Sequence, residues 1–188
     1  YPINNVKFFQ ISPGEYFTST IKISFYTGIL FSSPFLISQL ILFLLPGLTT
    51  NEKKIILPIL ISSLILFLFG LLFSYYTLIP AALNFFLAYS NEVIEPFWSF
   101  DQYFEFVLTL FYTTGIAFQI PILQILLGLL NIVSVKQMLA AWKYIILVST
   151  IIGAILTPST DPLTQLLLSS AILFLYFSGL GILSLIKN

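Results

Sequence analysis

Long runs of apolar residues, separated by short polar segments, dominate this chain of 188 residues. A helix needs about 20 apolar residues to cross roughly 30 Å of hydrocarbon. Five segments come close to this length or exceed it, and we expect each to span a membrane. Their expected bounds are 17–45, 55–76, 104–130, 138–157 and 163–186. The pattern therefore predicts an all-α polytopic membrane protein, built as a single integral membrane domain over residues 1–188.

Prolines inside the apolar runs predict irregular helices. Pro34 and Pro121 lie within the first and third expected spans, where each removes a backbone hydrogen bond, so both helices should be kinked. The second apolar run continues past Tyr76 to Tyr89. As one helix it would be about 50 Å long, so we expect it to break at Pro80.

The polar segments between the expected spans carry alternating charge. Lysines lie between the first and second spans, between the third and fourth, and after the fifth: Lys53, Lys54, Lys136, Lys143 and Lys187. Acids lie in the other two segments: Glu92, Glu95, Asp101 and Asp161. The positive-inside rule then places the lysines on the cis side, which is the cytoplasm, stroma or matrix. It makes 1–16 a trans-side loop, against the single charge of Lys7, and 89–103 an acidic trans-side loop.

Composition excludes several classes of function. Hydrophobic residues make up 59% of the chain, charged residues 7%, and the mean hydropathy is +1.05, so lipid is the expected solvent. A net charge of +0 argues against a nucleic-acid partner. The chain has no Cys and no His, and its acids are scattered. We therefore predict no metal site, no cofactor and no catalytic residues.

Residues 1–15 show neither the basic nor the apolar region of a signal peptide. A trans-side segment with no targeting element of its own can be explained by an earlier span that carried it across. A cleaved signal peptide would be the alternative explanation. We favour the earlier span.

Four short motifs follow one another at matching membrane depths. They are Ser12-Pro13-Gly14-Glu15-Tyr16-Phe17, Phe43-Leu44-Leu45-Pro46-Gly47-Leu48 with Asn51-Glu52-Lys53-Lys54, Phe118-Gln119-Ile120-Pro121, and Leu156-Thr157-Pro158 with Asp161. In this order the chain resembles TatC, the multi-spanning receptor subunit of the twin-arginine protein translocase, over nearly its whole length. Members of this family have six spans with both termini on the cis side. The resemblance implies that this chain corresponds to spans two to six.

Glu52 is the main candidate for ligand binding. Spacing alone favours an acid at the start of the second span, which Thr50 or Asn51 would cap. There Glu52 would complement the helix dipole or pair with a neighbouring lysine. The resemblance reverses this preference, since it places the family's signal-recognising acid here. A carboxylate can accept the parallel N–H bonds of an arginine. Phe43 and Leu48 flank Glu52 as apolar companions, and the resemblance assigns Phe43 a further recognition role.

Four more polar residues are candidates for a functional role, and two of them have two interpretations each. Gln119, deep in the third span, is either a helix-packing contact or, by the resemblance, a polar group facing the concave interior. Asp161 precedes Pro162 and suits a helix cap, whereas the resemblance makes it a recurrent trans-side acid. Thr157 and Gln165 correspond by resemblance to a polar cluster where the single-span partner subunits dock.

The resemblance implies a receptor and core component that binds Arg-Arg signal peptides and transports folded proteins with the energy of the proton gradient. The implied partners are membrane lipid, TatA- and TatB-type subunits, and further copies of this chain in a larger complex. A plastid thylakoid location is favoured over a bacterial plasma membrane or mitochondrial inner membrane. The alternative is a polytopic subunit of an ion-coupled transporter or respiratory complex, which predicts buried ionisable residues in mid-span.

Overall fold

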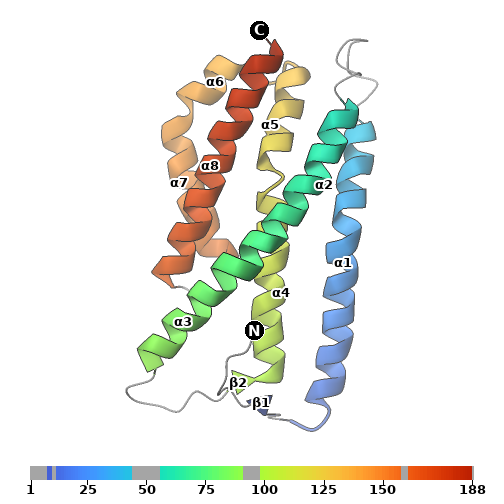
Figure 1. The fold of residues 1–188 in the computed structure, drawn as a ribbon, viewed down its shortest axis with the longest axis vertical. Helices are drawn as coiled ribbons and strands as arrows, with labels where there is room; N and C mark the ends of the chain where they lie inside the picture. The colour runs from blue at the N-terminus through green and yellow to red at the C-terminus, as the bar shows by residue number, and fades with distance from the viewer. Residues whose placement is uncertain (1–7, 10–11, 44–55, 91–97, 158–160, 188) are drawn as a thin grey trace.

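The structure, a computed structural model, describes residues 8–9, 12–43, 56–90, 98–157 and 161–187 (Figure 1). The described part is a helical bundle. Its helices are α1 (Glu15–Phe43), α2 (Ile56–Phe73), the π-helical turn η3 (Ser74–Leu78), α3 (Ile79–Ser90), α4 (Phe100–Ala117), α5 (Ile120–Leu129), α6 (Val135–Ala140), α7 (Trp142–Leu156) and α8 (Pro162–Lys187). Two short strands, β1 (Phe8–Phe9) and β2 (Trp98–Ser99), pair in parallel.

Four helical stretches in the described part are long and apolar enough to cross a membrane. They are Glu15–Phe43, Ile56–Ala88, Phe100–Leu129 and Pro162–Lys187. The fifth, α7, is apolar but has only 15 residues, about 22 Å of helix. It is short because the expected fourth span is divided at Ala141, with α6 before it. The expected all-α membrane fold is confirmed.

The expected break at Pro80 was wrong. The helix that starts at Ile56 runs on to Ser90 and changes only its winding, through the π-helical turn η3. In this turn the Ile79 N–H donates to the carbonyl oxygen of Ser74, five residues earlier. A wider turn just before Pro80 accommodates the proline ring, which would otherwise clash with the carbonyl of Tyr76, without ending the helix.

The third span is interrupted just before Pro121, where a kink was expected. Helix α4 ends at Ala117 and α5 begins at Ile120, so Phe118 and Gln119 form a break in the helix just before the proline. Pro34 has a weaker effect, because α1 continues through it undivided. The two ends of this third stretch also differ from the expected bounds, since α4 starts at Phe100 and α5 ends at Leu129. The expected acidic loop 89–103 therefore overlaps two helices.

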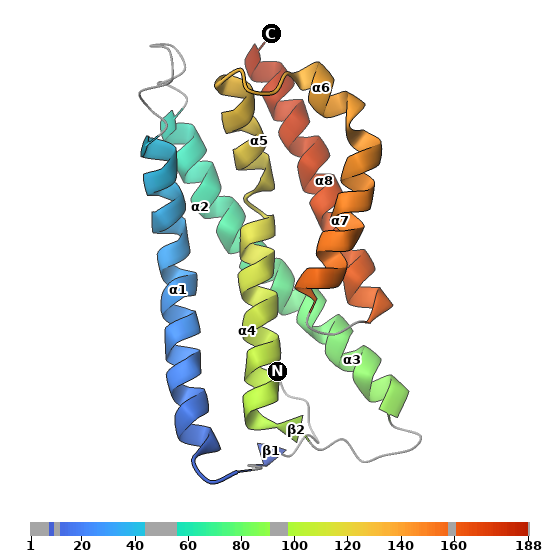
Figure 2. The ribbon, with the colours of Figure 1, turned by 180° about the vertical axis from the view of Figure 1, so that it is seen from behind.

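Helix α8 lies between α5 and α7, while α4 packs against both α1 and α2 (Figure 2). The buried residues of α5 and α8 form the largest apolar cluster, together with Met138 of α6 and three residues of α1 and α2. Helix α1 is peripheral, and only 17% of its most apolar stretch is buried. The C-terminus, α6, the last turn of α1 and the first turn of α2 share one end of the bundle (Figure 1).

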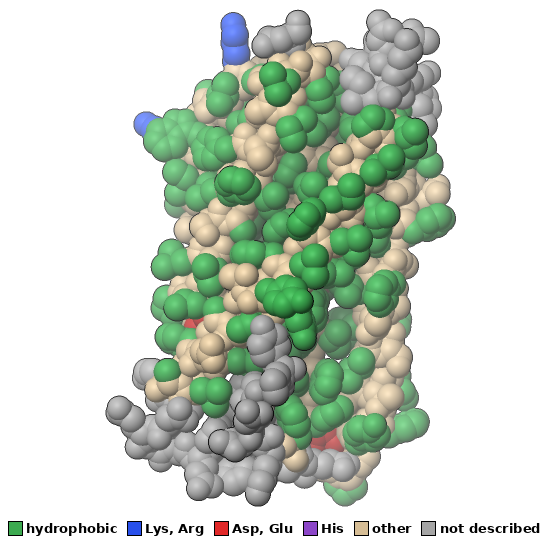
Figure 3. Space-filling model, viewed as in Figure 1, with side chains coloured by type: hydrophobic (Ala, Val, Ile, Leu, Met, Phe, Trp, Pro, Cys, Tyr) green, Lys and Arg blue, Asp and Glu red, His purple; other side chains and the backbone are tan. Residues whose placement is uncertain are grey.

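Most charged side chains of the described residues separate along the length of the bundle, with the exception of Lys22, which lies near the start of α1 at the acidic end. Lys136, Lys143 and Lys187 belong to α6, the start of α7 and the end of α8, and blue side chains project from this end in Figure 3. The acidic side chains seen in that view lie nearer the opposite end. Which end faces the cis side stays a prediction from the lysine distribution.

Candidate functional site

The expected signal-peptide site is only partly described. Glu52 and Leu48 lie outside the described residues, as do Lys53 and Lys54. Phe43 is the last residue of α1, and its ring is 81% exposed. Because α1 and α2 pack against each other, the segment that carries Glu52 joins two neighbouring helix ends. These ends lie at the same end of the bundle as the C-terminus (Figure 1).

Gln119 sits in the break between α4 and α5 and is 3% exposed. The Ser63 hydroxyl donates to its Oε1 over 2.6 Å, and its Nε2 donates to the Ser63 carbonyl oxygen over 3.1 Å. Both ends of the amide are therefore used by α2. This is the geometry of a helix-packing contact, which was one of the two interpretations of Gln119.

Thr157 and Gln165 lie on either side of the contact between α7 and α8. The Thr157 hydroxyl, 4% exposed, donates to the Gly153 carbonyl oxygen over 2.9 Å. The half-buried Gln165 donates from Nε2 to the Thr150 carbonyl oxygen over 3.3 Å. Ser169 of α8 also donates to the Ser149 carbonyl oxygen of α7 over 3.1 Å. The structure thus places Gln165 in a polar seam between α7 and α8, whereas the hydrogen bond of Thr157 stays within α7.

Asp161 caps helix α8. Its Oδ2 accepts a hydrogen bond of 2.9 Å from the backbone N–H of Thr164, and the side chain is 2% exposed. Pro162 follows as the first helical residue, where its missing N–H costs nothing. The geometry is that of the helix cap, which was the favoured interpretation of this residue from its position alone.

The sequence interpretation missed a polar cluster where α1 and α4 begin. Lys22 Nζ lies 2.9 Å from Asp101 Oδ2, and the Ser19 hydroxyl donates to Asp101 Oδ1 over 2.7 Å. Next to them, the Ser99 hydroxyl donates to Glu15 Oε1 over 2.6 Å. The charge pattern placed Asp101 in the acidic trans-side loop with Glu92 and Glu95, and it predicted no partner for Lys22. Opposite charges near the starts of two spans were the signal that could have revealed this pair.

The Lys22 and Asp101 pair should hold the first turns of α1 against α4. The two side chains remain 49% and 25% exposed, so solvent weakens their attraction. For Asp101→Asn we expect amide hydrogen exchange in residues 15–24 to become about two- to fivefold faster. The double exchange K22D/D101K should return the rate most of the way to that of the wild type. An exchange rate that stays unchanged in Asp101→Asn would show that the pair contributes nothing to the contact between α1 and α4.

No group of three or more His, Cys, Asp or Glu residues lies close enough to bind a metal within the part of the chain that the structure describes. Several buried polar side chains in the described membrane segments donate hydrogen bonds to another helix or to their own helix instead, for example Ser63, Gln119 and Thr114. Among the buried side chains of the described residues, Gln124 and Ser74 carry polar atoms without a hydrogen-bond partner.

Comparison with known proteins places this arrangement in one family. Residues 1–170 match the family model of the Sec-independent protein translocase protein (TatC). The chain is 82% identical over 187 residues to the uncharacterized tatC-like protein ycf43 of Trieres chinensis, and the match covers 100% of this chain and 71% of that protein. It is 55% identical over 185 residues to the Sec-independent protein translocase protein TatC of Synechocystis, with 98% and 73% covered.

The fold agrees with this assignment. A crystal structure of the twin arginine translocase receptor TatC matches with a TM-score of 0.83 and 34% sequence identity, over 96% of this chain and 80% of that one. The matched family model covers most of the chain, and the matched structure shares its helical bundle. The chain therefore belongs to the TatC family, and it is a membrane-embedded component of the twin-arginine protein translocase.

Proposed function

We propose that this chain is the receptor of the translocase, which binds Arg-Arg signal peptides and passes folded proteins across the membrane with the energy of the proton gradient. Membership of the TatC family carries this proposal, and the matched solved structure is described as a receptor. The chain itself contributes an exposed aromatic residue, Phe43, at the start of the segment with the candidate acid Glu52.

The chemistry of recognition follows from these two residues. The carboxylate of Glu52 is the natural acceptor for the N–H groups of an arginine pair, because such bonds are charge-assisted and often bidentate. The exposed ring of Phe43 offers apolar contact to the hydrophobic part of a signal peptide. Lys53 and Lys54 repel a cationic ligand, so they lower the affinity of the segment for a signal peptide. Their main role is to hold the segment on the cis side. Weak affinity suits a receptor that must release its cargo.

Partner subunits would dock on the α7 and α8 side of the bundle. Thr157 is buried and bonded within its own helix, so the docking surface consists of the partly exposed Gln165 and the exposed residues beside the seam. Small residues in the seam, such as Gly153 and Ser169, keep α7 and α8 close together. The expected partners are TatA- and TatB-type single-span subunits, further copies of this chain, and lipid. We place the complex in a thylakoid membrane, in keeping with the cyanobacterial relative.

A photoreactive phenylalanine derivative at position 43, with Glu52 kept, tests the receptor proposal. We expect it to crosslink to a signal peptide with Arg-Arg at least tenfold more than to the same peptide with Lys-Lys, because lysine cannot form the bidentate contact. The same amino acid at Asn84, an exposed position of α3 far along the chain, is the control and should label neither peptide. Equal labelling of both peptides from position 43 would refute the proposal.

A further inference from the structure

Helix α6 is attached to the bundle through a buried polar contact with α8. The Tyr176 hydroxyl of α8 donates to the Met138 carbonyl oxygen of α6 over 2.9 Å, and Tyr176 is only 6% exposed. The side chain of Met138 joins the apolar cluster that α5 and α8 form. Helix α6 has only six residues, and a helix of that length is not stable by itself. Its position therefore depends on such contacts with its neighbours.

Gln124 of α5 lies beside this contact without a hydrogen bond of its own. Its side chain is 5% exposed, and neither Oε1 nor Nε2 has a partner among the described residues. Oε1 occupies the space that a Cβ atom would take at Gly179, which follows Tyr176 by one turn on the same face of α8. The amide is thus within reach of the Tyr176 hydroxyl. Since both atoms are buried, a partner for them must come from within the bundle.

The Met138 carbonyl oxygen would keep a donor if the Tyr176 hydroxyl turned away, because the Ala141 N–H also donates to it over 3.2 Å. A phenolic hydroxyl has one proton, which can turn to either of two acceptors within reach. Turning it to Oε1 of Gln124 would give that buried oxygen its missing donor. Leaving such an acceptor unpaired costs free energy, so the present arrangement has a competitor inside the bundle.

We infer that the Tyr176 hydroxyl is a latch with two positions. When it donates to Met138 it holds α6 against α8, and when it donates to Gln124 it releases α6. The release changes the end of the bundle that also carries the C-terminus, the last turn of α1 and the first turn of α2 (Figure 1). The latch does not depend on signal-peptide binding, although α6 shares its end of the bundle with the helices that Glu52 lies between.

Hydrogen exchange of the full chain in lipid nanodiscs tests the latch with Gln124→Leu. We expect exchange in residues 135–141 to become about tenfold slower, because a hydroxyl that leaves Met138 would then find no acceptor. Exchange in residues 163–175 of α8 should not change, which separates the latch from a general gain in stability. Faster exchange of α6 would show that the amide supports the bond to Met138. Faster or unchanged exchange would each overturn the latch.

Tyr176→Phe removes the hydroxyl from both positions. Exchange in α6 should become about three- to fivefold faster, because one buried hydrogen bond no longer holds it. Adding Gln124→Leu to Tyr176→Phe should then have no further effect on α6, since the amide acts only through the hydroxyl. If Gln124→Leu slows the exchange of α6 equally with and without the hydroxyl, the latch is refuted.

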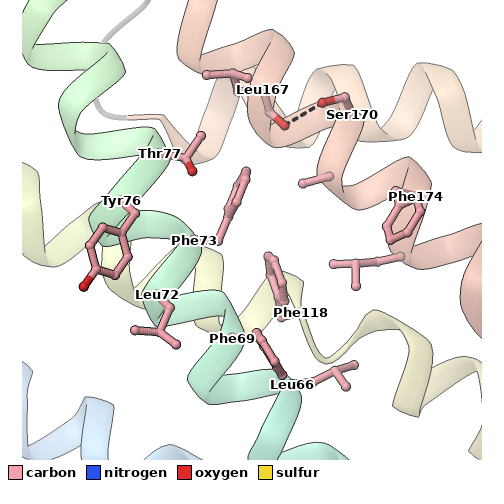
Figure 4. A pocket seen from close by; sticks show the side chains of 12 residues that line it. Leu66, Phe69, Leu72, Phe73, Tyr76, Thr77, Phe118, Leu167, Ser170 and Phe174 are labelled. Carbon is pink, nitrogen blue, oxygen red and sulfur yellow. Dashed lines mark hydrogen bonds between the residues drawn. The ribbon is translucent and has the colours of Figure 1, made fainter.

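Ser74→Ala is the matched control, because the Ser74 hydroxyl is also buried and has no partner among the described residues. Ser74 lies in η3, which packs against α2, α3, α4 and α8. It follows Phe73, whose ring packs against Phe118 with centroids 5.7 Å apart (Figure 4). Exchange in α6 should be unchanged in Ser74→Ala. Slowing as large as in Gln124→Leu would show a general effect of removing unpaired buried groups, and would overturn the latch.

A fluorine label observes the hydroxyl directly. In a chain with 3-fluorotyrosine at position 176, the fluorine lies next to the hydroxyl and senses its acceptor. We expect saturation-transfer ¹⁹F NMR to detect two exchanging states when Gln124 is present and a single state in Gln124→Leu. A single state with the same chemical shift in both chains would contradict the latch.

Discussion

Replacing Glu52 with alanine is expected to weaken binding of an Arg-Arg signal peptide about thirtyfold, because the loss of a charge-assisted hydrogen bond costs about 2 kcal/mol. Membrane insertion should stay intact, since the lysines near Glu52 would still mark the cis side. Fluorescence anisotropy of a labelled signal peptide, titrated with the purified protein in lipid nanodiscs, measures the change. The affinity of Glu52→Gln should fall between those of the wild type and Glu52→Ala, because an amide keeps one acceptor oxygen but no charge.

Two controls separate recognition from structure. Lys53→Ala removes a neighbouring charge of the opposite sign and should leave the affinity unchanged or raise it. A Lys-Lys peptide should bind the wild type and Glu52→Ala with similar, low affinity. If Glu52→Ala instead fails to insert, Glu52 acts as the helix-start acid that its position alone suggests. If it inserts and binds Arg-Arg peptide normally, the receptor site lies elsewhere.

The helical architecture could be predicted from the apolar runs because, in a membrane, backbone groups must find partners within their own helix. The irregular places could be predicted less well. Pro121 does divide its span, but Pro80 does not, because the π-helical turn before it adapts the winding. A proline shows where a hydrogen bond is missing, and packing decides whether the helix breaks, kinks or rewinds.

The polar residues show a similar limit. Position alone favoured capping by Asp161, and its contact with Thr164 is the contact of a cap. The partner of Gln119 could not be found from the sequence, because Ser63 lies 56 residues away on another helix. For the same reason the pairing of Lys22 with Asp101 was missed, since each residue looked like a separate charge at the start of a span.

A leucine in place of Gly179 should be the most destabilising of the changes considered. A Cβ atom at Gly179 would overlap Oε1 of Gln124 and lie 2.9 Å from the Cα of Pro121 on α5. The Pro121 backbone cannot rotate away as a side chain could, so α5 and α8 must separate. We expect a loss of about 3 kcal/mol in the free energy of unfolding, the upper range for overpacking a well-packed interior.

Gly181→Leu provides the matched control, because it lies two residues further along α8 and a Cβ atom added there would have no neighbouring atom within 4 Å. Its side chain would enter lipid, so the unfolding free energy should change by less than about 0.5 kcal/mol. Both variants can be compared by reversible unfolding of the purified protein in mixed detergent micelles. Equal stability of the two variants would mean that α5 and α8 do not approach closely at Pro121. A large loss confined to Gly179→Leu would show that the helix break before Pro121 is held in place by direct contact with the backbone of α8.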